Sequence, residues 1–393
     1  MQDMFSDRIL GAKKSFIREI LKVTQNKDVI SFAGGLPNPI SFPTENLKVS
    51  MNRVVDEQGE NAFQYATTEG SLLLRQQIAK RYKKRFNLDF SPNDILITSG
   101  SQQALDLIGK VLVNKGDHVL IEKPGYLGTI QALSLYEPSF HGIDLLDNGL
   151  DLDRLKATLE AYPSKLLYTV PNFQNPTGLT YSLENREAVC ALLKQTSTYL
   201  IEDDPYGELR FTGEDLPYIQ SFGHEHSILL GSFSKIVTPG MRIGWLCTKD
   251  ALLMDKLIIA KQASDLHTNY FSQCVIADYL LHHDLDAHIS HIKTLYRKQS
   301  TAMVEAIREY FPSHIKFTVP EGGMFLWITL PEGMSSLEFF NLAAKENVAF
   351  VPGEPFYTEA LTSNTLRLNY TNSDVNSIQE GVKRLAKVFK TLC

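Results

Sequence analysis

Residues 228–247 read ILLGSFSKIVTPGMRIGWLC, with two short apolar runs, 228–231 and 243–247, on either side of a polar loop. Both runs are continuously apolar rather than alternating, which is typical of strands buried on both faces of a parallel sheet. Lys235 follows the first run closely, flanked by small hydroxyl residues and a Pro-Gly turn. This setting is not typical of surface sequence. We therefore interpret Lys235 as part of a site at the end of a buried strand.

Four further apolar runs of the same kind lie earlier in the chain, and helical stretches such as 101–113 and 183–195 lie between them. The runs are ILIT (95–98), HVLI (118–121), LLYTV (166–170) and YLIE (199–202). Strands that alternate with helices predict an α/β domain with a mostly parallel central sheet flanked by helices.

The C-terminal part has a different pattern. Residues 271–311 are predicted to be largely helical and to connect two domains. Strand signals at 325–330 and 365–370, followed by a helix near 374–391, predict a smaller α+β domain. A length of 393 residues also favours two domains over one.

Composition and charge exclude several classes of protein. The chain is 43% hydrophobic and 21% charged, as in soluble globular proteins, and its net charge of −6 gives no field that would recruit nucleic acid or an anionic membrane. No run of about 18 apolar residues could span a bilayer, and the N-terminus has no apolar core of signal-peptide length. The four cysteines have no metal-like or disulfide-like spacing. We expect a cytoplasmic protein without a metal site.

In an open parallel sheet, ligands bind beyond the carboxyl ends of the strands, so the residues after each run are the candidates for chemistry. Ser101 and Gln102 would open a helix, and the free N–H groups of a helix N-terminus suit a phosphate dianion. Arg242 would add a permanent countercharge, and Ser232 and Ser234 further donors. An ordinary helix cap is the simpler explanation of Ser101 alone.

Other residues at strand ends suit a planar, electron-poor ring. Asp203 could face a ring nitrogen and keep it protonated, although the local sequence does not choose between Asp203 and Asp204. Tyr206 could donate to a ring phenolate, Asn175 could bond a phenolic oxygen or a carboxylate, and Tyr126 could stack on the ring. Each is also compatible with an ordinary turn or with packing. Their order, each after a separate strand, makes the set specific for a phosphorylated aromatic aldehyde.

The last strand signal, TLRLNY (365–370), places Leu366, Leu368 and Tyr370 on one face and Arg367 on the other. Arg367 could hold a substrate carboxylate by two parallel hydrogen bonds. An exposed strand arginine is the better local explanation, so this role depends on the rest of the set.

Together, these residues carry a family resemblance. The chain resembles the class I/II aminotransferases of pyridoxal-phosphate (PLP) fold type I over essentially its whole length, and within them the 2-aminoadipate and kynurenine aminotransferase branch. The segments that carry the resemblance are FAGGLPNPISFP, QYATTEG, TSGSQQALDL, PNFQNPTG, EDDPYGELRF, GSFSKIVTPGMRIGW, EGGMFLWITLP, VAFVPGEPFY and NTLRLNY. The resemblance implies three parts: residues 1–45, an N-terminal helix and substrate-covering loop that pack with the small domain; residues 46–290, the large PLP-binding domain; and residues 291–393, the small C-terminal domain.

The resemblance also implies pyridoxal 5′-phosphate as cofactor, with Lys235, Asp203 and Tyr206 as catalytic residues and Lys235 as the Schiff-base lysine. The implied cofactor-binding residues are Ser101, Gln102, Tyr126, Asn175, Asp203, Tyr206, Ser232, Ser234, Lys235 and Arg242, together with Tyr65 from the neighbouring subunit of a homodimer. The implied substrate-binding residues are Arg367, Asn175, Gly35 and Arg18. Arg18, on an N-terminal helix, predicts tolerance of an acidic substrate side chain.

The implied function is transfer of an amino group between an L-amino acid (2-aminoadipate, glutamate, aromatic or branched-chain type) and a 2-oxo acid. Two alternatives stay open: another reaction of the same fold, such as a C–S β-lyase or a decarboxylase, and a non-catalytic PLP-binding regulatory module. Because the family pattern starts by residue 15, we expect no DNA-binding module of the MocR type before it. A nucleotide-binding enzyme lacks support, since neither GxGxxG nor GxxxxGK[ST] follows a predicted strand.

Overall fold

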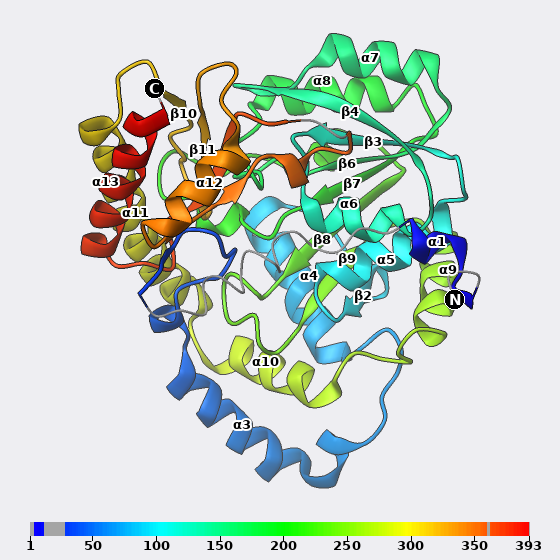
Figure 1. Cartoon of the computed structure of the whole chain (residues 1–393). Coiled ribbons are helices and arrows are strands. Elements are labelled where there is room, and N and C mark those ends of the chain that lie inside the picture. Colours follow the sequence, from blue (N-terminus) through cyan, green and yellow to red (C-terminus); the bar gives the residue numbers. More distant parts are fainter. Residues whose placement is uncertain (1–3, 12–27, 360–361, 393) are drawn as a thin grey trace.

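The computed structural model describes residues 4–11, 28–359 and 362–392. Its centre is an eight-stranded sheet with the order β2-β9-β8-β7-β6-β3-β4-β5 (Figure 1). The strands are β2 (Ile95–Thr98), β3 (His118–Lys123), β4 (Ser139–Leu146), β5 (Gly149–Leu150), β6 (Ser164–Thr169), β7 (Tyr199–Asp203), β8 (Ser227–Ser232) and β9 (Gly244–Cys247). The five strands β8, β7, β6, β3 and β4 run parallel, and β9 runs antiparallel to both of its neighbours. The predicted α/β fold with a mostly parallel sheet is confirmed.

Alternate residues of the central strands point into two separate cores. On β3, Val119 and Ile121 belong to one apolar cluster and Leu120 to the other. On β6, Tyr168 belongs to the first cluster and Leu167 to the second. Burial on both faces explains why these strands are continuously apolar in sequence.

Helices cover both faces of this sheet (Figure 1). Helices α7 and α8 contribute to the second, smaller cluster, whereas α3 to α6 and α9 to α11 contribute to the larger one. The helices up to residue 310 are α1 (Asp7–Leu10), α3 (Thr44–Gln58), α4 (Leu72–Phe86), α5 (Ser101–Leu112), α6 (Leu127–Ser134), α7 (Leu152–Ala161), α8 (Leu183–Leu193), α9 (Ala251–Gln262), α10 (Tyr270–His282) and α11 (Leu285–Tyr310). Short 3₁₀ helices are η2 (Pro39–Ser41), η3 (Gly59–Phe63), η4 (Pro92–Asp94), η5 (Gly207–Leu209), η6 (Ile219–Phe222) and η7 (Glu354–Phe356).

A second, antiparallel sheet of four strands forms the C-terminal part, with the order β10-β11-β14-β13. Its strands are β10 (Lys316–Phe317), β11 (Phe325–Thr329), β13 (Val351–Pro352) and β14 (Thr365–Asn369), and it is accompanied by α12 (Ser336–Lys345) and α13 (Val375–Leu392). Strand β1 (Ile30–Ser31) pairs with β12 (Val348–Ala349), so the chain around residue 30 joins the C-terminal part. Among the described helices, none combines the length and apolarity needed to cross a membrane.

Candidate active site

Lys235 lies in the connection between β8 and β9, where the chain must reverse because the two strands are antiparallel. Its Nζ donates a hydrogen bond to the carbonyl oxygen of Gly35, at 2.7 Å. Burial, together with the positive charges of Arg367 and Arg242, lowers the pKa of Lys235 to about 8. With that pKa, Lys235 is an uncharged amine in about a quarter of the molecules at pH 7.5. An uncharged amine can act as a nucleophile and as a base.

The two aspartates at the end of β7 have different partners. Asp203 is 2% exposed; its Oδ2 accepts a hydrogen bond from the Tyr168 hydroxyl at 2.7 Å, and its buried Oδ1 has no partner in the part of the chain that the structure describes. Asp204 instead accepts from the Asn172 amide at 3.0 Å, from a backbone N–H of the following turn at 2.8 Å and from the Tyr218 hydroxyl at 2.6 Å. The oxygen that is free to receive a ligand N–H therefore belongs to Asp203. Burial raises the pKa of Asp203 to about 7, against the effect of the Tyr168 hydrogen bond.

The N-terminus of α5 forms a cradle suited to an anion. Gly100 has a φ of 79°, and a Cβ there would come within 2.5 Å of Nη2 of Arg242. That Nη2 donates to the carbonyl oxygen of Ser99 at 3.1 Å. The helix cap is Gly100, and the hydroxyl of Ser101 is buried without a partner, so the simpler explanation of Ser101 as a helix cap is wrong. A guanidinium, a free hydroxyl and a helix N-terminus together suit a phosphate.

Three other residues predicted for this cradle bond one another or the neighbouring backbone. The Ser232 hydroxyl donates to the Ser234 hydroxyl at 2.8 Å. The amide of Gln102 is exposed and donates to the carbonyl oxygen of Gly128 at 2.9 Å. All three side chains keep polar atoms that a phosphate could contact.

Arg367 is in the middle of β14 and is 2% exposed, so the local explanation as an exposed strand arginine is wrong. Its Nη1 donates to Oδ1 of Asn175 at 2.8 Å and its Nη2 to the carbonyl oxygen of Ala33 at 2.7 Å, while its buried Nε has no partner within residues 4–11, 28–359 and 362–392. The guanidinium lies 4.3 Å from the ring centre of Phe325 and 5.3 Å from that of Phe356. Burial lowers the pKa of Arg367 to about 10, which still leaves it charged at neutral pH.

Asn175 connects this arginine to Tyr206, since its amide nitrogen lies 3.4 Å from the Tyr206 hydroxyl. Both side chains are buried, and the Tyr206 ring packs edge-on against Phe325. The structure thus joins Asn175, Tyr206 and Arg367, which are far apart in the sequence, into one polar group beside an apolar wall.

The remaining predicted residues differ in how the structure places them. Burial raises the pKa of Tyr126 to about 12, with Asp203, Arg367 and Arg242 as its charged neighbours, so it belongs to the same group. Tyr65 is 79% exposed and lies outside that group. Arg18 lies outside the described residues.

Sequence reasoning missed three contacts that the fold creates. Tyr168 binds Asp203, and Phe325 and Ala33 contact Arg367. A tyrosine inside the apolar run of residues 166–170 was the available signal for Tyr168, because a buried hydroxyl needs a partner. Backbone groups such as the carbonyl of Ala33 leave no sequence signal.

Comparisons with known proteins give a consistent result. The family described as "Aminotransferase class I and II" matches residues 35–385. Aromatic-amino-acid aminotransferase 1 of Thermococcus litoralis is 43% identical over 98% of this chain and 94% of its own length, and the 2-aminoadipate transaminase of Thermus thermophilus is 41% identical over 96% and 94%. The crystal structure of Pyrococcus horikoshii kynurenine aminotransferase, in complex with PMP, KYN and KYA, has a TM-score of 0.95 at 42% identity and covers 100% of this chain and 98% of that one.

Proposed function

The chain belongs to the class I and II aminotransferases, and from that premise we propose which of its residues carry out the transfer and which amino acids it accepts. It is a transaminase, and pyridoxal phosphate is its cofactor. The observation that carries the proposal is a set of three buried polar atoms without partners among the described residues: the Ser101 hydroxyl, Oδ1 of Asp203 and Nε of Arg367. Buried polar atoms nearly always have a hydrogen-bond partner in proteins, so three unsatisfied polar atoms in one site suggest a polar ligand.

These residues fit pyridoxal phosphate. We propose that Ser101, Gln102, Ser232, Ser234 and Arg242 hold its phosphate, because the cradle at Gly100 offers a guanidinium and free hydroxyls. The free Oδ1 of Asp203 suits the N–H of a protonated pyridine ring. Asn175 and Tyr206 would bond the ring oxygen, Tyr126 would stack on the ring, and Lys235 would bind the cofactor covalently. When bound, the cofactor withdraws electrons from the bonds at the α-carbon of the substrate.

The other steps belong to side chains of the protein. Arg367, with Asn175 beside it, binds the α-carboxylate of the amino acid by charge-assisted hydrogen bonds. Nζ of Lys235, whose pKa is lowered to about 8, then takes the proton from the α-carbon and later returns a proton as an acid. The apolar side chains at Arg367 exclude water from the charged groups.

The proposed amino donors are aromatic and 2-aminoadipate-type amino acids. Relatives at 41–43% identity have names of these two kinds. The buried rings of Phe325 and Phe356 pack next to the carboxylate-binding arginine, and this apolar environment suits an aromatic or long aliphatic substrate side chain. The segment around Gly35 completes this wall, since its carbonyl already contacts Lys235.

Absorbance spectroscopy of the purified holoenzyme tests the proposal. Cofactor bound to a lysine absorbs near ~420 nm and its aminated form near ~330 nm, so an amino acid added without an acceptor should convert one band into the other. Wild-type protein should show this conversion with tyrosine and 2-aminoadipate, whereas Lys235→Ala should bind the cofactor without the ~420 nm band. A normal band and normal turnover in Lys235→Ala would refute the assignment of this lysine.

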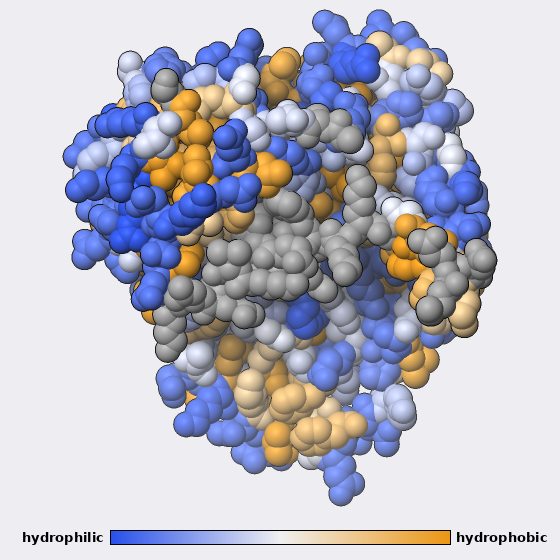
Figure 2. All heavy atoms as spheres, viewed as in Figure 1, coloured by the Kyte–Doolittle hydropathy of each residue, from blue (hydrophilic) through white to orange (hydrophobic). Residues whose placement is uncertain are grey.

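We also propose a homodimer in which Tyr65 reaches the cofactor site of the partner subunit. Tyr65 is 79% exposed and its neighbour Phe63 is 67% exposed, and Leu72 and Leu73 are exposed nearby in the sequence. Figure 2 shows apolar surface gathered on the lower face, where Figure 1 places α3 and α10. An exposed apolar patch on these elements suits a subunit interface.

Mixing two inactive variants tests this composite site. Tyr65→Ala and Lys235→Ala each damage both sites of a homodimer, but a mixed dimer has one intact site if Tyr65 acts across the interface. After subunit exchange, an equal mixture should regain about a quarter of wild-type activity. No regain of activity, or a monomer in analytical ultracentrifugation, would refute the composite site.

The division into residues 1–45, 46–290 and 291–393 remains part of the proposal. It is supported by the pairing of β1 with β12 and by the separation of the two sheets along the chain. We further propose a cytoplasmic location, because buried, unpaired cysteines suit a reducing compartment.

A further inference from the structure

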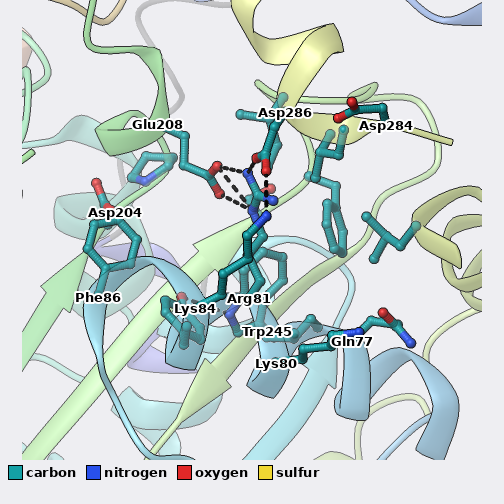
Figure 3. A pocket seen from close by; sticks show the side chains of 18 of the residues that line it. Gln77, Lys80, Arg81, Lys84, Phe86, Asp204, Glu208, Trp245, Asp284 and Asp286 are labelled. Atoms are coloured by element: carbon teal, nitrogen blue, oxygen red, sulfur yellow. Dashed lines mark hydrogen bonds and ion pairs between the residues drawn. The ribbon is translucent and has the colours of Figure 1, made fainter.

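A cavity of about 240 Å³ lies next to the β8–β9 connection that carries Lys235 (residues 233–243, the lysine loop) (Figure 3). Neither Arg367 nor Asn175, the proposed carboxylate-binding residues, lies in its wall. The cavity is enclosed by α4, by the turn that follows β7, by the β8–β9 connection and by the junction of α10 and α11. Ser232, one of the proposed phosphate-binding residues, lies in its wall, but the proposed function places no ligand in the cavity itself.

Aromatic side chains form much of its wall, among them Tyr82, Phe86, Tyr218 and Trp245. The polar atoms of three of them are already paired. The indole N–H of Trp245 donates to the Tyr82 hydroxyl at 3.0 Å, and the Tyr218 hydroxyl donates to Asp204 at 2.6 Å. The wall therefore offers ring surfaces rather than free polar groups. An apolar cavity of about 150 Å³ already takes a benzene molecule, so this one has room for an aromatic ring with a short substituent.

Charged residues form the rim, and most of them are paired with each other. Arg81 binds Glu208 and Asp286, and Lys84 binds Asp286 at 3.1 Å (Figure 3). Asp284 caps α11 through the backbone N–H of Ala287 at 3.0 Å. Arg81, in the middle of this network, is partly buried.

Three polar groups of the lining have no hydrogen-bond partner among the described residues: the ammonium of Lys80 and the amide of Gln77 at the rim, and the buried Nε2 of His283. Lys80 and Gln77 make no hydrogen bond or ion pair with any described residue, whereas the charged side chains of the lining other than Lys80 are all paired. Lys80 and Gln77 are three residues apart on α4, so they lie on the same face of the helix, and Figure 3 shows both at one edge of the cavity. An ammonium and an amide N–H next to each other suit a carboxylate.

The cavity also touches the segments that hold the cofactor-binding residues. Phe233 and Ile236, which line it, lie on either side of Lys235 in the β8–β9 connection. Asp204 and Pro205 line it as well and join Asp203 to Tyr206. An occupant would therefore pack against the two loops on which the proposed chemistry depends.

We propose that this cavity is a second ligand site, which binds a small aromatic carboxylic acid with its ring against Trp245 and Phe86 and its carboxylate at Lys80 and Gln77. The ligand packs against the lysine loop and against the turn that joins Asp203 to Tyr206. Through these two segments it affects the cofactor site without contacting the cofactor. The chemical class overlaps with the carboxylates that Arg367 binds, so the test must separate the two sites.

Isothermal titration of phenylacetate into the holoenzyme measures this binding directly. Lys80→Gln removes the charge at the rim and should weaken binding about tenfold. Leu280→Phe narrows the cavity without changing a charge and should abolish binding there. The matched control is Lys83→Gln on the same helix, whose lysine is exposed and pairs with Asp89 outside the cavity; it should bind as wild type does.

Arg367→Ala separates this inference from the proposed function. Phenylacetate should still bind to Arg367→Ala, and it should shift the cofactor absorbance of both wild-type and Arg367→Ala holoenzyme without converting the cofactor. Binding that is lost in Arg367→Ala and unchanged in Lys80→Gln and Leu280→Phe would place the ligand in the amino acid site and overturn the inference. No measurable binding to wild type would overturn it as well, while leaving the transaminase assignment intact.

Discussion

The hydrogen bond from Tyr168 to Asp203 gives a prediction that can be worked out from the structure. Tyr168 is fully buried on β6, next to the strand that ends in Asp203, and its hydroxyl lies 2.7 Å from Oδ2 of that carboxylate. This bond opposes the effect of burial, which raises the pKa of Asp203 to about 7. It also fixes the carboxylate so that Oδ1 stays free. We predict that Tyr168→Phe weakens cofactor binding without unfolding the protein.

The magnitude follows from the strength of a hydrogen bond to a charged group, about 1.5–3 kcal/mol. One pKa unit corresponds to about 1.4 kcal/mol, so loss of the bond should raise the pKa of Asp203 by about one to two units. At pH 7.5 the carboxyl group of the variant would then be mostly protonated, and it could not balance a protonated pyridine ring. Cofactor affinity should fall by about 10- to 100-fold.

Equilibrium dialysis of the cofactor between pH 6 and pH 9 would measure this change. The affinity of Tyr168→Phe should approach that of wild type as the pH rises past the new pKa of Asp203. The matched control is Tyr181→Phe, which removes an equally buried hydroxyl that donates to a different carboxylate, Glu122, at 2.6 Å. If Tyr168→Phe binds the cofactor as tightly as wild type at every pH, or if Tyr181→Phe shows the same loss, then the reasoning is wrong.

Three further predictions concern the same site. Arg367→Lys should lower kcat/KM for amino acids by about 100-fold while the cofactor spectrum stays unchanged, because an ammonium cannot replace a bidentate guanidinium; a loss below fivefold would contradict this role. In the cofactor-free protein, Lys235 should react with pyridoxal at a rate that rises with pH through an apparent pKa of about 8, since only the uncharged amine reacts. Borohydride reduction followed by peptide mapping measures this rate. A midpoint near pH 10 would contradict the lowered pKa of Lys235. The folded-state pKa of Asp203, about 7, lies above its unfolded value of about 3.9, so this group makes the cofactor-free protein less stable as the pH rises between those values. Denaturant titrations should show that Asp203→Asn lacks this part of the pH dependence, and parallel curves for the two proteins would refute it.

Much of the fold could be predicted from the sequence, because a strand that is buried on both faces of the sheet is continuously apolar in sequence. The apolar runs at 95–98 and 199–202, for example, correspond to β2 and β7. Strand β4 was missed, since only one of its eight residues is buried and the run SFHGIDLL carries no apolar pattern. The order of the strands and the antiparallel direction of β9 were not predictable, because they depend on pairing between segments far apart in the chain.

The sequence by itself determined which chemical groups stand at the ends of the strands, and the resemblance of their motifs to a known family indicated the cofactor. The local sequence does not distinguish Asp203 from Asp204, whereas the tertiary structure gives them different partners, because Tyr168, Asn172 and Tyr218 lie on other segments. The tertiary structure likewise decided that Arg367 is buried, since β14 is covered on both faces. Local sequence records which side chains a segment carries. Burial, partners and pKa shifts depend on what the rest of the chain packs against that segment, and no single stretch of residues contains that information.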